Sequence, residues 1–276
     1  MRRLEVSERR ALVQSADEPE HATVGVEHRL AIEHRRDRAE FDRELGRIAG
    51  WLPRDRPLRV LDLGCGAGSW SGYWLEMGAH LVALDLDVDF VRSAANRLTG
   101  DKGRLYPAVG DAGRVPLASR SFDVVTANSL LEHTPHWQSV VEEAARLVAP
   151  GGVLMLHTTN RFHPFQTEVR GFPFYPWLPE GVRNRVLAWI MKNRPDLVAY
   201  TDLPAVNWFH PVKLKAFVAG LGLDVFERLE LVRPEELHGV RALGRWMVSR
   251  DGRHVRGRTL YYLLTKSVSL YARRPA

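Results

Sequence analysis

The sequence predicts an α/β protein with a mostly parallel sheet, and three observations lead to this fold class. Short apolar runs alternate with stretches of helical period between Val60 and Thr158. A glycine-rich turn, residues 64–68, directly follows the first apolar run, and carboxylates follow the second and third runs at Asp85 and Asp111. Strands separated by helices require right-handed crossovers, which place helices on both faces of a parallel sheet.

The change of pattern along the chain predicts where each element lies. We expect strands at residues 60–63, 81–85, 105–109, 122–127, 153–158, 223–231 and about 260–271. We expect helices near residues 69–78, 88–98, 137–148, 181–192 and 211–220. Pro53 and Pro57 end the segment before the first strand, and residues 220–222 stop the last helix.

Two segments depart from this alternation and define the expected domain organisation. Residues 1 to about 22 mix charged and small residues, which predicts a frayed or disordered arm, and residues 26–52 carry the period of one or two amphipathic helices. Residues 160–209 are rich in proline and aromatic side chains. We therefore expect an N-terminal arm with helices over 1–56 and a main domain over 57–276, with a lid-like insertion at about 160–209.

Composition and charge restrict the class of protein. Hydrophobic residues make up 45% and charged residues 26% of the chain, which is typical of a globular protein. We expect neither a membrane span nor a secretion signal, because no window reaches the ~18 apolar residues of a span and no apolar run follows the basic N-terminus. Cys65 is the single cysteine, so a disulfide within the chain cannot form, and we predict a cytoplasmic protein without a metal site.

The net charge of +6 and the pI of about 9.7 have two interpretations. One is a solvated, arginine-rich surface. The other is an anionic partner, namely nucleic acid, a phosphorylated substrate or an acidic lipid surface. The second interpretation keeps peripheral contact with a membrane open.

The turn Gly64-x-Gly66-x-Gly68 lies at the carboxyl end of the first strand, where open α/β sheets bind ligands. Glycines let the backbone turn tightly and let a ligand approach main-chain groups. The spacing differs from the G-x-G-x-x-G of dinucleotide sites, so a nicotinamide or flavin cofactor fits less well. Asp85 lies 21 positions after Gly64, near the ~20 expected for a carboxylate that accepts ribose hydroxyls. Asp111, at the next strand end, is placed to accept an adenine amine, so these groups predict a nucleoside-sized cleft.

The stretch from about Val60 to Arg161 resembles a class I S-adenosylmethionine-dependent methyltransferase, in particular the small-molecule branch that includes the ubiquinone-biosynthesis O-methyltransferases. The segments that carry this resemblance are VLDLGCGAG (60–68), ALD (83–85), GDA (110–112), SFDVVTANSLLEH (121–133) and LVAPGGVLMLHTTNR (147–161). The resemblance implies a Rossmann-like, seven-stranded, mostly parallel sheet with an antiparallel last strand. It also implies S-adenosyl-L-methionine as the cofactor and makes 57–276 a methyltransferase domain.

The resemblance further implies which residues surround the methionine part of the cofactor. They are the side chain of Asp62 and the turn residues Gly64, Cys65, Gly66 and Gly68. An arginine of the N-terminal helices is also implied to pair with the cofactor carboxylate, but the sequence does not rank the candidates Arg35, Arg36, Arg38 and Arg43.

The adenosine part is implied to contact a second group of residues. Asp85, with Leu86 beside it, is implied to hold the ribose, and Asp111 with the amide of Ala112 to hold the adenine. Asn128, just past the fourth strand, is implied to lie beside the sulfonium.

Methyl transfer from a sulfonium is an in-line displacement, so positioning and exclusion of water supply most of the rate. A hydroxyl acceptor still needs a base, and a histidine suits that task near neutral pH. His133 is the first candidate because it follows the fourth strand, at the mouth of the cleft. The alternatives are His136, His163 and His210. A structural role, in which Glu132 and His133 only orient the loop and the following helix, also stays open.

The insertion more loosely resembles a cap of bacterial methyltransferases. The matching pieces are Asn160-Arg161, Glu168-Val169-Arg170, Pro173-Phe174 and Trp177-Leu178-Pro179, and Arg170 stands where the cap has a histidine, so that histidine's role does not carry over. Three interpretations remain for the aromatic side chains of this segment: they line the acceptor, they contact a membrane interface together with nearby arginines, or they pack the cap onto the domain. The aromatic residues are Phe172, Phe174, Tyr175 and Trp177, and the arginines are Arg183 and Arg185.

Taken together, these patterns predict methyl transfer to a small or lipid-linked acceptor, at oxygen, with the insertion as a lid. Asn128-Ser129-Leu130 lacks the Asn-Pro-Pro-Tyr type of motif, which disfavours a nucleobase or glutamine as the target. An RNA methyltransferase remains an alternative because residues 233–258 are basic, although nucleic acid is not the expected partner. A protein that binds the cofactor without turnover is the second alternative. The sequence does not determine the oligomeric state.

Overall fold

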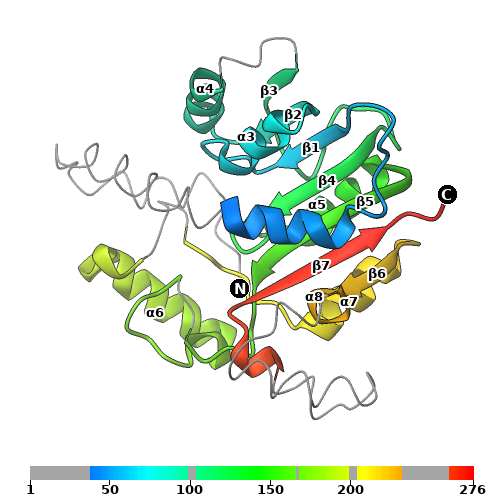
Figure 1. Cartoon of the computed structure of the whole chain (residues 1–276). Coiled ribbons are helices and arrows are strands. Elements are labelled where there is room, and N and C mark those ends of the chain that lie inside the picture. The colour runs from blue at the N-terminus through cyan, green and yellow to red at the C-terminus, as the bar shows by residue number, and fades with distance from the viewer. Residues whose placement is uncertain (1–37, 99–103, 166–167, 199–203, 232–260) are drawn as a thin grey trace.

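A seven-stranded sheet runs through the centre of the protein in the part that the structure describes, residues 38–98, 104–165, 168–198, 204–231 and 261–276 of a computed structural model (Figure 1). The strand order is β3-β2-β1-β4-β5-β7-β6. The strands are β1 (Arg59–Leu63), β2 (His80–Asp85), β3 (Leu105–Val109), β4 (Phe122–Asn128), β5 (Val148–Thr159), β6 (Asp224–Glu227) and β7 (Ser267–Arg273). Strands β1 to β5 pair in parallel, whereas β7 is antiparallel to both β5 and β6. The predicted α/β fold and its antiparallel last strand are confirmed.

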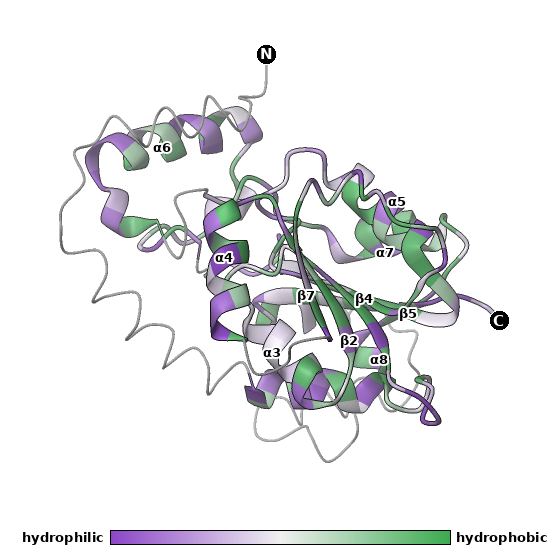
Figure 2. Ribbon diagram, turned by 90° about the horizontal axis from the view of Figure 1, so that it is seen from above, coloured by the Kyte–Doolittle hydropathy of each residue, from purple (hydrophilic) through white to green (hydrophobic). Residues whose placement is uncertain are grey.

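Helices cover both faces of this sheet, as the view from above shows (Figure 2). One face carries α5 (Trp137–Leu147) and α7 (Pro211–Ala219), and the other carries α3 (Ser69–Glu76), α4 (Val88–Arg97) and the helical residues 38–48. Alternate residues of a strand point to opposite faces, so each strand supplies both cores. In β4, Val125 packs on the α5 side and Val124 on the α3 side, and neither is exposed. This is why the central strands read as nearly continuous apolar runs.

The insertion has a small core of its own. Its main elements are α6 (Glu180–Asn193) and the short helical turns η2 (Tyr175–Trp177) and η3 (Pro195–Leu197). Tyr175 and Ile190 are buried there against Trp208, and the Tyr175 hydroxyl donates to the Arg183 carbonyl over 3.1 Å. In Figure 1, α6 stands away from the central sheet. The boundaries at residues 56, 160 and 209 stay predictions.

Three of the expected strands were wrong in their extent. The strand expected over 223–231 ends at Glu227 and turns into α8 (Arg228–Leu231), because the Glu230 carboxylate accepts the Glu227 amide over 2.7 Å and starts a helical turn. The strand expected over 260–271 does not begin until Ser267, and residues 261–264 are helical. Also, β5 begins five residues before the expected start, at Val148.

Of the three interpretations left open for the insertion, packing applies to Arg183, since it is 8% exposed, its guanidinium donates to the Pro176 carbonyl, and it lies over the ring of Trp208. Tyr175, 1% exposed, likewise cannot reach a membrane or an acceptor. The expectations for the N-terminal arm and the basic stretch 233–258 lie outside the described residues, as do Arg35 and Arg36.

Candidate functional site

The carboxyl ends of β1, β2 and β3 are joined by backbone hydrogen bonds into one edge. The amides of Gly64 and Cys65 both donate to the Leu84 carbonyl, over 2.8 and 3.0 Å. The Gly110 amide, just past β3, donates to the Asp85 carbonyl over 2.9 Å. The structure therefore brings the glycine turn, the end of β2 and the start of the Asp111 loop together, as the sequence predicts.

The glycine turn needs glycine for two different reasons. Gly64, Gly66 and Gly68 all have positive φ angles, of 68°, 51° and 80°, a region that other residues adopt only with strain. At Gly64 a Cβ atom would also lie 2.8 Å from Leu130 Cδ1. At Gly66 a Cβ atom would meet nothing within 4 Å. Gly64 is thus fixed by packing, while the space over Gly66 is open to a ligand.

Asp85 connects this turn to the end of β2. Its carboxylate accepts the Gly66 amide over 2.9 Å and the Asp87 amide over 3.0 Å. The side chain is half-buried, and the neighbouring Leu86 is 58% exposed. A carboxylate and an apolar side chain next to an open glycine turn suit the ribose and the base of a nucleoside.

Asp111 lies on the same edge and is exposed. Its carboxylate accepts the Gly113 amide over 2.8 Å, which fixes the loop after β3, and Ala112 beside it is buried. Asp111 therefore keeps acceptor capacity at the surface of the edge.

Asp62 takes a different position from the other carboxylates. It is 2% exposed, and it accepts hydrogen bonds from Ser71 on α3 over 2.6 Å and from Thr126 on β4 over 3.0 Å. Burial raises the pKa of Asp62 to about 6, against the effect of these two hydrogen bonds. The Asp62 carboxyl therefore has a structural role, because its hydrogen bonds hold α3 and β4 at the start of the glycine turn.

Cys65 is buried beneath the turn. Burial raises the pKa of its thiol, which therefore stays protonated, and its sulfur is 3.5 Å from the Gly66 carbonyl. Its side chain contributes packing, and its backbone contributes to the turn.

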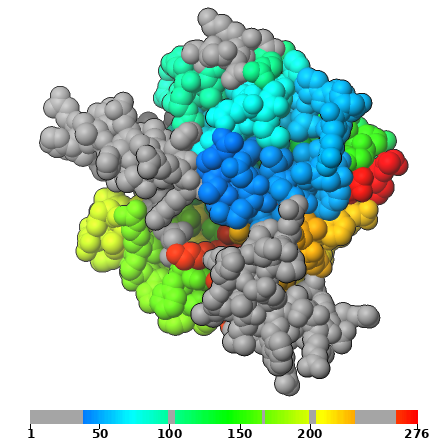
Figure 3. All heavy atoms as spheres, viewed as in Figure 1, coloured from blue at the N-terminus to red at the C-terminus, as the bar shows by residue number. Residues whose placement is uncertain are grey.

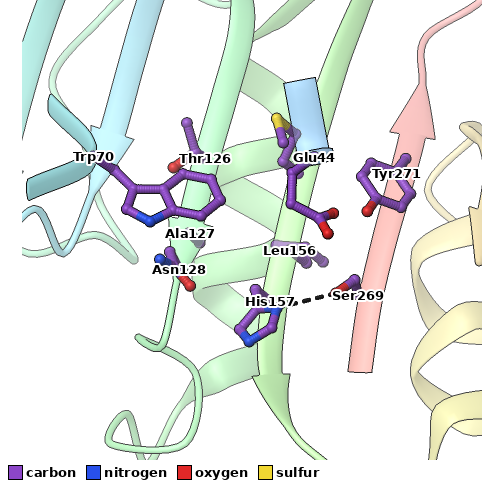
Figure 4. Close-up of a pocket in the computed structure, with 10 residues that line it drawn as sticks. Glu44, Trp70, Thr126, Ala127, Asn128, Leu156, His157, Ser269 and Tyr271 are labelled. Atoms are coloured by element: carbon purple, nitrogen blue, oxygen red, sulfur yellow. Dashed lines mark hydrogen bonds between the residues drawn. The ribbon is translucent and has the colours of Figure 1, made fainter. Parts of the chain in front are cut away.

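A pocket lies next to this edge, over the carboxyl ends of β4 and β5 (Figure 4). We call it the strand-end pocket. Its lining comes from residues 38–48, α3, β4, β5 and β7, and comprises Glu44, Trp70, Thr126, Ala127, Asn128, Met155, Leu156, His157, Ser269 and Tyr271. Of the predicted site residues, Asn128 lines it. The helix at residues 38–48 lies in the middle of the face shown in Figure 3, and its Glu44 lines the pocket.

His133 and Glu132 lie in the loop after β4. Glu132 is 3% exposed, and it accepts the Thr158 hydroxyl over 2.7 Å, while its carbonyl accepts the amides of Val206 and Asn207. Burial raises the pKa of Glu132 to about 7, despite that hydrogen bond. His133 is half-buried, and its amide donates to the Leu130 carbonyl over 3.1 Å. The loop thus ties the insertion to β5, and the catalytic role of His133 stays a prediction.

The other three candidate histidines are dispersed. His136 is exposed before α5. His163 is 8% exposed and accepts the Phe165 amide over 3.1 Å, and His210 packs against Phe162 before α7. Burial lowers the pKa of both His163 and His210. Neither lines the strand-end pocket.

The insertion exposes part of its aromatic segment. Phe174 and Trp177 are 47% and 46% exposed, and their ring centroids lie 4.9 Å apart. Phe165, 62% exposed, contacts Phe174 at 6.1 Å. Phe172 instead packs against the core of the insertion. Two of the four predicted aromatic residues therefore remain available to a ligand or a partner.

Sequence reasoning missed most of the strand-end pocket. His157 interrupts the apolar run of β5 near its carboxyl end, and Glu44 occupies the apolar side of its helix, three positions after Phe41 and four before Ile48. Polar residues in such places signal a buried site. Nothing local marks Ser269 or Tyr271, because the pairing of β7 with β5 brings them there.

Comparison with known proteins agrees with this geometry. Residues 61–156 match the family described as a methyltransferase domain. The malonyl-[acyl-carrier protein] O-methyltransferase of Pectobacterium atrosepticum is 31% identical over 212 residues, which are 63% of this chain and 82% of that protein. The ubiquinone biosynthesis O-methyltransferase of Xanthomonas oryzae pv. oryzae is 39% identical over 106 residues, or 37% of this chain and 44% of that protein. The chain thus spans less than half the length of the second relative.

Solved structures show the same fold. An S-adenosylmethionine-dependent methyltransferase from Mesorhizobium loti superimposes with a TM-score of 0.53 at 16% identity, covering 84% of this chain and 98% of that one. A seven-stranded sheet of this order with a glycine turn and acidic strand ends defines a nucleoside-binding α/β enzyme. The chain belongs to the class I S-adenosylmethionine-dependent methyltransferases. The predictions of a methyltransferase and of S-adenosyl-L-methionine as its cofactor are confirmed.

Substituting the two glycines of the turn should separate packing from ligand binding. We expect Gly64→Ala to lower the free energy of unfolding by about 3 kcal/mol, because backbone strain adds to the overlap with Leu130. Gly66→Ala, the matched variant, should cost only about 1 kcal/mol but should weaken binding of S-adenosylmethionine, because its methyl group enters the open space. Urea unfolding and calorimetry measure the two effects, and equal losses of stability would contradict this account.

The buried carboxyl of Glu132 should make stability depend on pH. The pKa of Glu132 is raised from 4.5 to about 7 in the fold, so its contribution to stability is complete below pH 4.5 and is lost as the pH rises through 7. We expect wild-type protein to lose about 3 kcal/mol more than Glu132→Gln over this range. Urea midpoints at pH 4.5 and 8 test this, with the exposed Glu142→Gln as control. Parallel curves for wild type and Glu132→Gln would rule the effect out.

Proposed function

We propose that this protein transfers the methyl group of S-adenosylmethionine to a hydroxyl oxygen of a small or lipid-linked acceptor. The observation that carries the proposal is the Asp85 carboxylate beside the open glycine turn, next to a pocket that contains a histidine. The curated relatives that the chain matches are named as O-methyltransferases, which supports oxygen as the atom that is methylated.

Each part of the cofactor has residues that suit it. The ribose hydroxyls would donate to Asp85 beside Leu86, and the adenine would lie between Leu86 and the Asp111–Ala112 loop. The methionine part would lie over the backbone of residues 64–68, which Asp62 holds in place from inside. Asn128, half-buried at the end of β4, would lie beside the sulfonium.

When bound, the cofactor supplies a methyl group attached to a sulfonium. The rest of the cofactor is then a good leaving group, because it departs as a neutral thioether. The chain therefore has to orient the acceptor, exclude water and remove one proton. His157 lies within β5 near its carboxyl end, and His133 lies in the loop after β4. His133 is the base predicted from the sequence, and we keep it as a candidate in this proposal.

The size and class of the acceptor follow from the elements around the pocket. The insertion, with Phe174 and Trp177 exposed, would act as the lid over the rest of the acceptor. Every helix in the described ranges is too short or too polar to cross a bilayer. A lipid-linked acceptor would therefore be reached from the membrane surface, through the exposed aromatic side chains and Arg185.

Asp85 tests the cofactor site. We expect Asp85→Ala to weaken binding of S-adenosylmethionine about 100-fold, because two hydrogen bonds to a charged group are lost. Asp89→Ala is the matched control, since Asp89 is an exposed acid at the start of α4 and should change binding less than twofold. Isothermal calorimetry measures both affinities. Undiminished binding to Asp85→Ala would remove the ribose assignment, and no binding to the wild-type protein would remove the proposed function.

The acceptor itself can be found without presupposing its class. We expect incubation of metabolite and lipid extracts with the enzyme and methyl-labelled S-adenosylmethionine to give a product heavier by one labelled methyl group, and alkaline stability of the product should separate an ether from an ester. Mass spectrometry identifies it, and Asp85→Ala serves as the inactive control. Labelling of RNA alone, in the same extracts, would overturn the small-molecule proposal.

A further inference from the structure

We propose that the strand-end pocket receives the reacting end of the acceptor as a neutral hydroxyl group, and that His157, oriented by Ser269, takes its proton. This inference rests on the proposed function and names a base that the sequence did not point to. It follows from the register of β4, β5 and β7 and from the hydrogen bond of His157. It also follows from two buried polar groups, Tyr271 and Glu44, that line the strand-end pocket.

The register places His157 next to the residue expected beside the sulfonium. Asn128 and His157 are direct partners in the parallel pairing of β4 with β5, and His157 and Ser269 are direct partners between β5 and β7. The three side chains therefore form one row on one face of the sheet, with neighbouring strands about 4.8 Å apart. The row Thr126, Met155 and Tyr271 lies one pleat deeper. A group bound beside Asn128 is thus one strand away from the imidazole.

The hydrogen bond to Ser269 orients the imidazole. His157 Nδ1 lies 3.0 Å from Ser269 Oγ, and Ser269 is 6% exposed. Figure 4 shows the second ring nitrogen turned away from Ser269, toward the carboxyl end of β5. In the tautomer that carries hydrogen on Nδ1, Nε2 is left as an acceptor at the carboxyl end of β5. His157 is half-buried, whereas its neighbours Leu156 and Thr158 are buried.

Two further polar groups point into the pocket, and the Tyr271 hydroxyl has no hydrogen-bond partner among the described residues. The Tyr271 side chain is 1% exposed, and its hydroxyl makes no hydrogen bond to any described residue. The Glu44 carboxyl, 2% exposed, points toward that hydroxyl in Figure 4. Leaving a buried hydroxyl unpaired is unfavourable, so a ligand that carries a polar group would be stabilised by pairing with it.

The charges around the pocket favour a neutral acceptor over a carboxylate. Glu44 is the charged group among the lining residues, and no lysine or arginine of the described chain lines the pocket. Arg47 and Arg228 approach Glu44 at 3.1 and 3.6 Å, so their charge is already directed to that carboxyl. Trp70, Met155 and Leu156 supply apolar walls. An anionic oxygen would face Glu44, while a phenol or an alcohol would not be repelled.

The proton and electron balance of the step is simple. The acceptor oxygen gives its proton to His157 Nε2 and uses the electron pair of the O–H bond to form the new O–C bond. The electron pair of the broken sulfur–carbon bond stays on sulfur. The imidazolium that results faces Glu44 across the pocket, and Glu44 is close enough to His157 for an electrostatic interaction. Besides Glu44 and His157, Tyr271 is the other titratable residue that lines the pocket.

Binding tests the pocket independently of turnover. Calorimetry with protein saturated with S-adenosylhomocysteine would use catechol as the neutral probe and malonate as the anionic one. We expect catechol to bind, and we expect His157→Ala and Tyr271→Phe each to weaken its binding about fivefold. His80→Ala, at the exposed amino end of β2, should leave its binding within twofold. Failure of S-adenosylhomocysteine to bind would count against the proposed function. Normal S-adenosylhomocysteine binding with no catechol binding, or with tighter malonate binding, would overturn the pocket assignment alone.

Rates test the base. We expect methylation of catechol, or of the acceptor found in extracts, to fall 10²-fold or more in His157→Ala with binding of S-adenosylmethionine unchanged, and added imidazole to restore part of the rate. Ser269→Ala should lower kcat with little change in KM and should shift the acid limb of the pH–rate profile, since it alters the imidazole and not the fold. His80→Ala, at the exposed amino end of β2, should keep the wild-type rate. Loss of activity in His133→Ala with full activity in His157→Ala would overturn the assignment and return the role to His133.

Discussion

The site depends most on the two hydrogen bonds that the buried carboxyl group of Asp62 accepts. Asp62 lies at the end of β1, directly before the glycine turn, and joins that strand to α3 through Ser71 and to β4 through Thr126. A carboxyl that accepts two hydroxyls in an apolar environment fixes the relative positions of three elements. The end of β1 and the start of α3 are thereby fixed. Residues 64–68 must connect them within five positions, which requires a tight turn. Without this anchor, Asp85 and Asn128 would not face one cleft.

A second set of buried polar groups holds the insertion and the last strand to the cofactor edge. The Glu132 carboxyl binds Thr158 of β5, and its carbonyl binds the returning chain at Val206 and Asn207. The Asn160 amide, 1% exposed, donates to the carbonyls of Tyr262 and Thr265. These contacts connect residues 26 to 105 positions apart in the sequence. The side proposed for the acceptor is therefore held by contacts up to 105 positions apart, whereas the glycine turn contacts Asp85 only 19 positions away.

This difference corresponds to the two tasks of a methyltransferase, which are to bind the cofactor and to bind the acceptor. The cofactor is common to the whole family, and a strand, a turn and a helix can bind it wherever they occur in that order. The acceptor differs from one relative to another, as the names of the matched proteins show. In this chain the pocket proposed for the acceptor combines residues 38–48, β5 and β7. The carboxyl, imidazole and phenol groups of Glu44, His157 and Tyr271 come from these three separate segments.

The sequence by itself determined the strand–turn–helix order, the family and the edge at which the cofactor binds. These features are local: the apolar period of 2 or 3.6 residues, the glycines at alternate positions and the acids at strand ends each act within a few residues. Only the tertiary structure decided that Asp62 points inward, that Tyr175 and Arg183 are buried, and that β6 gives way to a helical turn after Glu227. It also decided that His157 lies beside Asn128 and Ser269, because strand register joins residues more than 100 positions apart and no local pattern encodes it.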